Sequence, residues 1–118
     1  MAKIPDPTKG SENAMHLVID GHGCDPALLS DMEVVREFLD RYPGAINMTK
    51  IMTPHVQVYN GPVPEDWGVS GFVIIAESHI SVHTFPDRSY LNVDVFSCKE
   101  FDSILAETEI KSYFGIRR

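Results

Sequence analysis

The stretch that decides the fold runs from Gly68 to Pro86 and reads GVSGFVIIAESHISVHTFP. Its segment Phe72 to Ala76 is apolar and has three β-branched residues in five, which predicts a strand buried on both faces. Polar and apolar residues alternate again from His79 to His83, so a second extended segment is expected. Ser78 lies at the break between them, where a turn or bulge would strain the peptide bond between Glu77 and Ser78.

Two helices are predicted on either side of this stretch. The serine and glutamate of Ser30-Asp31-Met32-Glu33 form a capping box, and apolar residues follow at helical spacing until Pro43-Gly44 ends the helix. A second helix is expected from Lys99 or Glu100. Its apolar side at positions i, i+3, i+4 and i+7 would consist of Phe101, Ile104, Leu105 and Thr108.

The remaining periodic segments predict further strands at residues 16–20, 45–51, 55–59 and 91–96, with a proline-rich loop at 61–67. Strands separated by two helices, without regular β-α-β alternation, indicate an α+β fold. We therefore expect a two-layer sandwich in which both helices pack on one face of a mainly antiparallel sheet.

Length and composition limit the classes of function. A chain of 118 residues fits a single domain, assigned to residues 15–118, after a flexible leader at 1–14 with Met15 as the functional start. A net charge of −7 argues against nucleic-acid binding. No apolar run approaches a membrane span and no secretory signal is visible, so a cytoplasmic location is the default. Cys24 and Cys98 are then expected to be free thiols.

Three motifs stand in order along the chain. They are Gly-Val-Ser-Gly at 68–71, Glu-Ser-His at 77–79 followed by His83-Thr84-x-Pro86, and Val-Asp-Val-Phe-Ser-Cys at 93–98, with weaker support from His16-Leu17-Val18 ahead of Gly23-Cys24. A serine, a histidine five positions later and a cysteine twenty positions later form a specific combination. Together the motifs resemble the short prokaryotic form of the S-adenosylmethionine decarboxylase family, whose members are self-processing and pyruvoyl-dependent.

The resemblance implies that Ser78 is the precursor of a pyruvoyl cofactor. In the family, the serine hydroxyl attacks the preceding carbonyl, an ester replaces the amide, and elimination followed by hydrolysis leaves a pyruvoyl group on the new chain. Cleavage would fall between Glu77 and Ser78. The pyruvoyl carbonyl forms a Schiff base with the substrate amine and acts as the electron sink that decarboxylation requires. Taken alone, a serine at this position is more typical of a turn at a strand end, and the accompanying motif residues favour the functional interpretation.

Three further residues match functional positions of the family. His83 corresponds to the histidine that takes the proton lost in ester elimination, and Ser70 to a serine that assists processing. Cys98 corresponds to the cysteine that protonates the carbon left after CO2 departs, a role that a thiol can fill. The residues alone also allow a hydrogen-bonded histidine, a turn serine and a buried small apolar cysteine at these positions.

Substrate-binding residues match less closely. The phenylalanine that stacks on adenine in the family has no counterpart in register, so Tyr59 or Trp67 is expected to replace it, and Phe85 stands where a tryptophan is common. The first strand ends in Asp20 where a glutamate is usual. The carboxylates of Asp20, Glu65 and Asp66 would also suit arginine or ornithine, which some relatives decarboxylate.

S-adenosylmethionine, feeding polyamine and spermidine biosynthesis, is nevertheless the first expectation, and the family predicts a homodimer with active sites near the subunit interface. The alternatives are an arginine or ornithine decarboxylase, and an unprocessed homologue that acts as a partner or regulator. A Ser78–His83 hydrolase is disfavoured because no nucleophile-elbow glycines surround Ser78. Metal binding is not expected, because His79 and His83 would lie ~13 Å apart on a straight strand.

Overall fold

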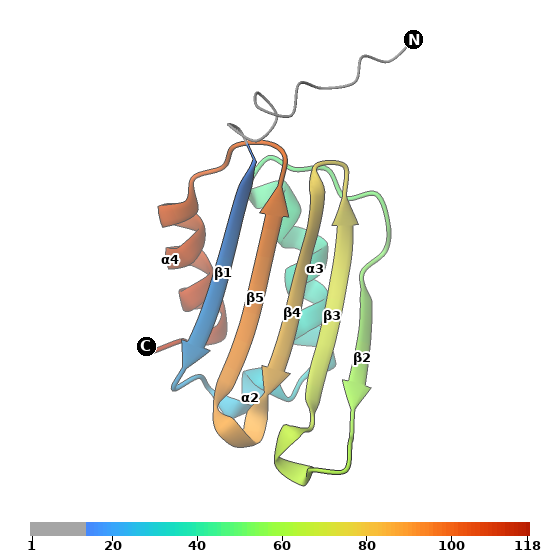
Figure 1. Cartoon of the computed structure of the whole chain (residues 1–118), viewed down its shortest axis with the longest axis vertical. Helices are drawn as coiled ribbons and strands as arrows, with labels where there is room; N and C mark the ends of the chain where they lie inside the picture. Colours follow the sequence, from blue (N-terminus) through green and yellow to red (C-terminus); the bar gives the residue numbers. More distant parts are fainter. Residues whose placement is uncertain (1–13) are drawn as a thin grey trace.

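A computed structural model describes residues 14–118 of the chain. Five strands form one sheet in the order β1-β5-β4-β3-β2, and every neighbouring pair is antiparallel (Figure 1). The predicted α+β two-layer sandwich is confirmed, whereas residues 1–13 of the predicted leader lie outside the described part. The elements are β1 (Met15–His22), α2 (Pro26–Leu29), α3 (Met32–Ala45), β2 (His55–Tyr59), η1 (Pro64–Asp66), β3 (Gly68–Ile75), β4 (Ser78–Phe85), η2 (Pro86–Arg88), β5 (Tyr90–Ser97) and α4 (Ser103–Phe114).

The helices cover one face of the sheet and enclose the core. Phe38 of α3 is the centre of an aromatic cluster, with ring centroids 5.0 Å from Tyr42 and 5.0 Å from Phe114 of α4. Inward-facing strand residues such as Val73 and Ile80 are fully buried beneath the helices. Burial of these apolar side chains is the main stabilising contribution to the fold. Within residues 14–118, no helix is long and apolar enough to cross a membrane.

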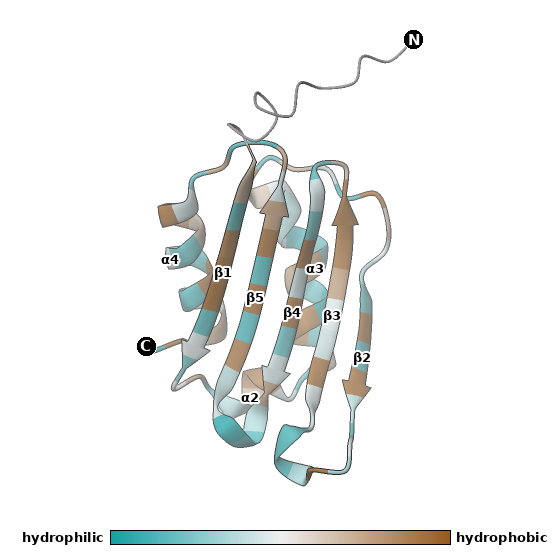
Figure 2. Cartoon of the chain, in the orientation of Figure 1, coloured by the Kyte–Doolittle hydropathy of each residue, from teal (hydrophilic) through white to brown (hydrophobic). Residues whose placement is uncertain are grey.

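The opposite face of the sheet, called here the open face, carries no helix. Hydropathy alternates along β4 and β5 in Figure 2, as expected when one side of a strand packs on a core and the other does not. The prediction that residues 72–76 form a strand buried on both faces is wrong for the single chain, because Phe72 is 40% and Ile74 43% exposed on the open face. All five histidines of the chain project from this face: His16, His22, His55, His79 and His83.

The predicted strand at 45–51 is also wrong. Helix α3 continues through Pro43 to Ala45, and the chain then turns at Asn47, whose φ is 59°. Ile46 and Met48 are apolar because they pack into the core, not because they pair in a sheet. Only Lys50 forms an isolated bridge, to Ile75 at the end of β3.

Both helices begin later than the sequence pattern predicted. Asp31, not Ser30, caps α3, because its carboxylate accepts a hydrogen bond from the Glu33 amide at 2.8 Å. Asp102 likewise caps α4, which shifts the helix start to Ser103.

The buried side of α4 therefore differs from the predicted one, and consists of Ala106, Ile110 and Phe114. Ile104 and Leu105, which were expected to face the core, are 77% and 53% exposed.

Gly68 permits the close approach of β3 and β4. A Cβ at this position would collide with the backbone carbonyl oxygen of Thr84, and Thr84 cannot withdraw easily because its hydroxyl donates to the Leu29 carbonyl and accepts from the Val69 amide. We expect Gly68→Ala to lower the free energy of unfolding by about 1–3 kcal/mol, measured by urea denaturation. Gly44→Ala lies at a position of α3 where an added Cβ would meet no other atom, and it should instead raise the free energy of unfolding by about 0.5–1 kcal/mol. Equal effects of the two substitutions would contradict this interpretation of the strand contact.

Candidate functional site

The turn between β3 and β4 places Ser78 at the end of two central strands. Ser78 pairs with Ile75 on one side and with Ser97 of β5 on the other. Its φ of 158° is close to the extended region that any residue adopts, so strain in the Glu77–Ser78 bond stays a prediction. The side chain is half-buried at the end of these strands.

The peptide group that precedes Ser78 is fixed from both ends. The Glu77 carbonyl oxygen accepts a hydrogen bond from the Cys98 amide at 2.9 Å, and the Glu77 carboxylate accepts one from the Thr49 amide at 3.1 Å. A backbone N–H directed at a carbonyl oxygen polarises it and stabilises the negative charge that forms when a nucleophile attacks its carbon. The serine hydroxyl next in the chain is such a nucleophile.

Cys98 lies directly after β5 in a turn that Ser97 holds in place. The Ser97 hydroxyl donates to the Lys99 carbonyl at 2.7 Å and accepts from the Lys99 amide at 2.9 Å. The Cys98 thiol is exposed and forms no disulfide. The structure thus brings Ser78, Glu77 and Cys98 together at one end of the sheet, a group called here the serine cluster.

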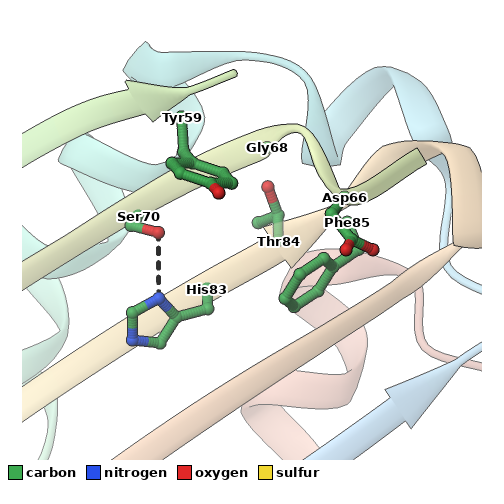
Figure 3. Close-up of a pocket in the computed structure, with 7 residues that line it drawn as sticks. All are labelled: Tyr59, Asp66, Gly68, Ser70, His83, Thr84 and Phe85. Atoms are coloured by element: carbon green, nitrogen blue, oxygen red, sulfur yellow. Dashed lines mark hydrogen bonds between the residues drawn. The ribbon is translucent and has the colours of Figure 1, made fainter. Parts of the chain in front are cut away.

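Ser70 and His83 form a second group toward the other end of the strands. They face each other across β3 and β4 on the open face, and Ser70 Oγ lies 2.9 Å from His83 Nδ1 (Figure 3). A cavity of ≈ 330 Å³ beside them is lined by Tyr59, Asp66 and Phe85, among others. We call this group the histidine cluster.

Within one chain the two clusters are separated. Ser78 and His83 lie five residues apart on the continuous strand β4, and a rise of about 3.3 Å per residue puts about 17 Å between their backbones. The sequence motif predicted a histidine that acts on Ser78, but a single chain does not bring this histidine to it.

The predicted substrate residues divide into two sets. Tyr59 and Phe85 both line the cavity, as Figure 3 shows, so an aromatic side chain is available on either side of it. Trp67 does not line this cavity and instead donates through Nε1 to Asp87 at 3.1 Å. Tyr59 therefore fits the expected stacking position better than Trp67 does.

The predicted carboxylates are mostly engaged within the chain. Asp66 lines the cavity but accepts two hydrogen bonds from Arg88, at 2.8 and 3.1 Å. Asp20 accepts from Tyr90 at 2.6 Å and from Asn92 at 3.0 Å, and these bonds hold its carboxyl pKa below the ordinary value.

The same Asp20 contact raises the pKa of the Tyr90 hydroxyl, because the neutral phenol donates to a carboxylate. Glu65 is exposed in η1 and lines no part of the cavity.

Sequence reasoning about the chemistry missed two contacts near Ser78. His79 Nδ1 lies 3.4 Å from Ser78 Oγ, although His79 was considered only as a metal ligand. The Cys98 amide contacts the Glu77 carbonyl, whereas the sequence motif draws attention only to the thiol of Cys98. The Glu-Ser-His motif contains a signal for the Ser78–His79 contact, because adjacent residues at a strand end can share a face after a turn.

The chain is similar to known proteins of one family. Residues 15–118 match the model of the family described as S-adenosylmethionine decarboxylase. A relative named S-adenosylmethionine decarboxylase proenzyme from Pyrococcus furiosus is 38% identical over 85 residues, which cover 72% of this chain and 57% of the relative. The relative of the same name from Clostridium botulinum (strain Langeland) is 39% identical over 89 residues, covering 75% of this chain and 72% of the relative.

A crystal structure of the adenosylmethionine decarboxylase from Aquifex aeolicus superposes with a TM-score of 0.74 at 30% identity, covering 90% of this chain and 83% of that one. The matched region spans 57–58% of the length of the relatives from Pyrococcus furiosus, Pyrococcus abyssi and Thermodesulfovibrio yellowstonii. With a family model that covers the domain from β1 to the last residue and a solved relative of the same fold, the chain belongs to the S-adenosylmethionine decarboxylase family.

Proposed function

We propose that this chain is the proenzyme of a pyruvoyl-dependent decarboxylase that cleaves itself between Glu77 and Ser78. The observation that carries the proposal is the Glu77 carbonyl, which accepts the Cys98 amide at 2.9 Å while the Ser78 hydroxyl follows it in the chain. When a serine hydroxyl attacks the carbonyl of the preceding residue, a five-membered ring forms. The former carbonyl oxygen, attached to the ring carbon, then carries a negative charge and needs a donor such as this N–H. Family membership supports the same chemistry.

The proposed processing proceeds in three steps. Ser78 Oγ bonds to the Glu77 carbonyl carbon, and the bond from this carbon to the Ser78 nitrogen breaks, which converts the amide into an ester. Removal of the Ser78 Cα proton then expels the Glu77 carboxylate. Hydrolysis of the resulting enamine releases ammonia and leaves a pyruvoyl group at residue 78. That group supplies the electron sink for decarboxylation.

Cys98 is the proposed proton donor after CO2 leaves. Its position in the serine cluster supports this role, since Glu77, Ser78 and Cys98 share one end of the sheet and the thiol is exposed. A thiol donates a proton readily near neutral pH. The Ser97 hydroxyl bonds that fix the turn keep Cys98 beside residue 78.

A second copy of the chain is proposed to supply His83 and Ser70. The distance of about 17 Å along β4 prevents His83 from taking the Cα proton of Ser78 in its own chain. The open face supports pairing of two sheets, because it exposes apolar side chains at Phe72 and Ile74 that a second layer would bury. Two copies related by a two-fold axis that runs across the strands would place each serine cluster against the partner's histidine cluster.

S-adenosylmethionine is the proposed substrate, which places the reaction in polyamine biosynthesis. Tyr59 and Phe85 give the cavity aromatic walls that suit a nucleoside base and a sulfonium cation. A site for arginine or ornithine would need a carboxylate free to pair with the ligand, but Asp66 is paired with Arg88 and Asp20 with Tyr90 and Asn92. Decarboxylation of a basic amino acid therefore remains the second candidate, supported only by the place of Asp66 in the cavity wall.

Self-cleavage is tested by intact mass spectrometry of denatured, freshly purified protein. We expect two fragments divided between Glu77 and residue 78, with the C-terminal one lighter than its serine-terminated sequence by one ammonia. Ser78→Ala should leave a single chain, because the nucleophile is gone. An uncut wild-type chain would instead favour the unprocessed homologue that acts as a partner or regulator.

The sharing of one site between two copies is tested by mixing two inactive variants. Chains with Ser78→Ala and chains with His83→Ala, carrying different tags, should each fail to form pyruvoyl alone. When they are co-expressed, the His83→Ala chain should acquire a pyruvoyl terminus in mixed dimers, because its intact Ser78 meets an intact His83 of the other variant. Mass spectrometry of the separated chains measures this. The proposal of a shared site would be wrong if co-expression gave no pyruvoyl on either chain.

Substrate choice is tested with CO2 release from S-adenosylmethionine, arginine and ornithine by the processed protein. We expect release from S-adenosylmethionine alone. Tyr59→Ala should raise KM about tenfold or more, since stacking on a base contributes roughly 1–3 kcal/mol. Trp67→Phe should leave KM near the wild-type value, because Trp67 lies outside the cavity. Release from arginine or ornithine only, or a larger effect at Trp67 than at Tyr59, would contradict this assignment.

A further inference from the structure

A chain of polar contacts leads away from Ser78 across the open face. His79 Nδ1 lies 3.4 Å from Ser78 Oγ, and the other ring nitrogen of His79, Nε2, lies 3.7 Å from Asp94 Oδ1 on β5. The same Asp94 oxygen lies 2.8 Å from His16 Nε2 on β1. A hydroxyl, an imidazole and a carboxylate in this order form the arrangement that activates a nucleophile.

The imidazole of His79 is held in its orientation by packing. Its ring stacks on Phe96 of β5, with centroids 5.8 Å apart and an interplanar angle of 13°. His16 packs edge-on against the same Phe96 ring, with centroids 5.2 Å apart. The register explains this grouping, because His79 pairs with Phe96 and Phe96 pairs with His16 across three neighbouring strands.

We propose that His79 is the general base that takes the hydroxyl proton of Ser78 during ester formation, and that Asp94 positions it. The inference rests on the proposed self-cleavage. The Ser78 Oγ–H proton passes to His79 Nδ1 as Oγ bonds to the Glu77 carbonyl carbon. His79 then gives the proton to the Ser78 nitrogen when the carbon–nitrogen bond breaks, which converts the amide nitrogen into the amine.

Asp94 fixes the form of the ring that this step requires. A carboxylate beside Nε2 favours the tautomer that carries its proton on Nε2, which leaves Nδ1 free to accept from Ser78. His16 holds Asp94 from the far side and is the only other titratable side chain in contact with this carboxylate among the described residues. From β3, the neighbour of His79 in register is the uncharged Ile74.

His79 and His83 then act on different protons of the same serine. His79 contacts the Ser78 hydroxyl within one chain, whereas His83 is about 17 Å along the strand and is supplied by the second copy for the Cα proton. Loss of His83 should therefore stall the protein after the ester has formed. Loss of His79 should stall it before the ester. Hydroxylamine distinguishes the two, because it cleaves an ester and leaves an amide intact.

Chains that carry His83→Ala are made by cell-free translation, and samples taken over time are treated with hydroxylamine. The amount of chain that hydroxylamine cleaves measures ester formation. The added change His79→Gln should slow the appearance of hydroxylamine-cleavable chain by about a hundredfold, the range of general-base catalysis. His22→Gln, another histidine of the open face, should leave the rate within about twofold of the background. Circular dichroism and melting temperature of each variant show whether the fold is retained.

Asp94 is tested by non-additivity and by rescue. Asp94→Asn should slow ester formation in the same background, and the double variant with His79→Gln should be no slower than His79→Gln alone. Asp94→Glu, which keeps the carboxylate, should restore part of the rate that Asp94→Asn loses. A merely structural role of Asp94 would give multiplicative losses in the double variant and no rescue by glutamate.

The outcomes separate this inference from the function on which it rests. A wild-type chain that neither cleaves itself nor becomes sensitive to hydroxylamine overturns both. A wild-type chain that cleaves, together with a His79→Gln chain that forms the ester at the background rate, overturns the role of His79 alone. Loss of ester formation in His79→Gln, with a normal rate in His22→Gln and a retained fold, supports it.

Discussion

The position of β4 between β3 and β5 is the constraint on which the rest of the site depends. Antiparallel pairing on both sides holds β4 extended from Ser78 to Phe85. A strand cannot fold back on itself, so the backbones of two residues five positions apart stay about 17 Å apart however the surrounding loops move. The pairing therefore keeps the serine cluster and the histidine cluster at different places along the same strand.

The same pairing brings together groups that are distant in sequence. The Cys98 amide reaches the Glu77 carbonyl only because the turn after β5 lies beside the turn before β4. The segment after α3 adds the Thr49 amide, which binds the Glu77 carboxylate. Three connections of the chain thus hold Glu77 in place, through its carbonyl and its carboxylate.

Much of this fold could be predicted from periodicity. Strands β4 and β5 follow their alternating residues closely, because one side of each packs on a helical layer. Strand β3 was indicated instead by its continuous apolar, β-branched run. The segment 45–51 was misread because Ile46 and Met48 are buried as the chain leaves a helix, and burial alone does not distinguish a strand from a packed turn. The α4 face was misread because Ile104 and Leu105 are exposed in the chain, so their apolar character gave the wrong side.

The site itself was only partly predictable, for a reason that the open face makes clear. The motif spacing identified Ser78, His83 and Cys98, but spacing does not state whether two residues meet within one chain or between two. The apolar run 72–76 predicted burial on both faces, whereas the single chain buries one. A second sheet against the open face would meet both expectations at once, since it would bury Phe72 and Ile74 and bring a His83 toward Ser78.

The proposed arrangement would divide the two proton transfers of processing between a single chain and a pair of chains. The groups proposed for ester formation, namely the Ser78 hydroxyl, His79 and the Cys98 amide, all belong to one chain. The group proposed for elimination, His83, has to come from a second copy. Ester formation exchanges one acyl bond for another and can reverse, whereas elimination cuts the chain and cannot. The irreversible step would then depend on assembly, so that only a chain already paired with its partner commits to cleavage.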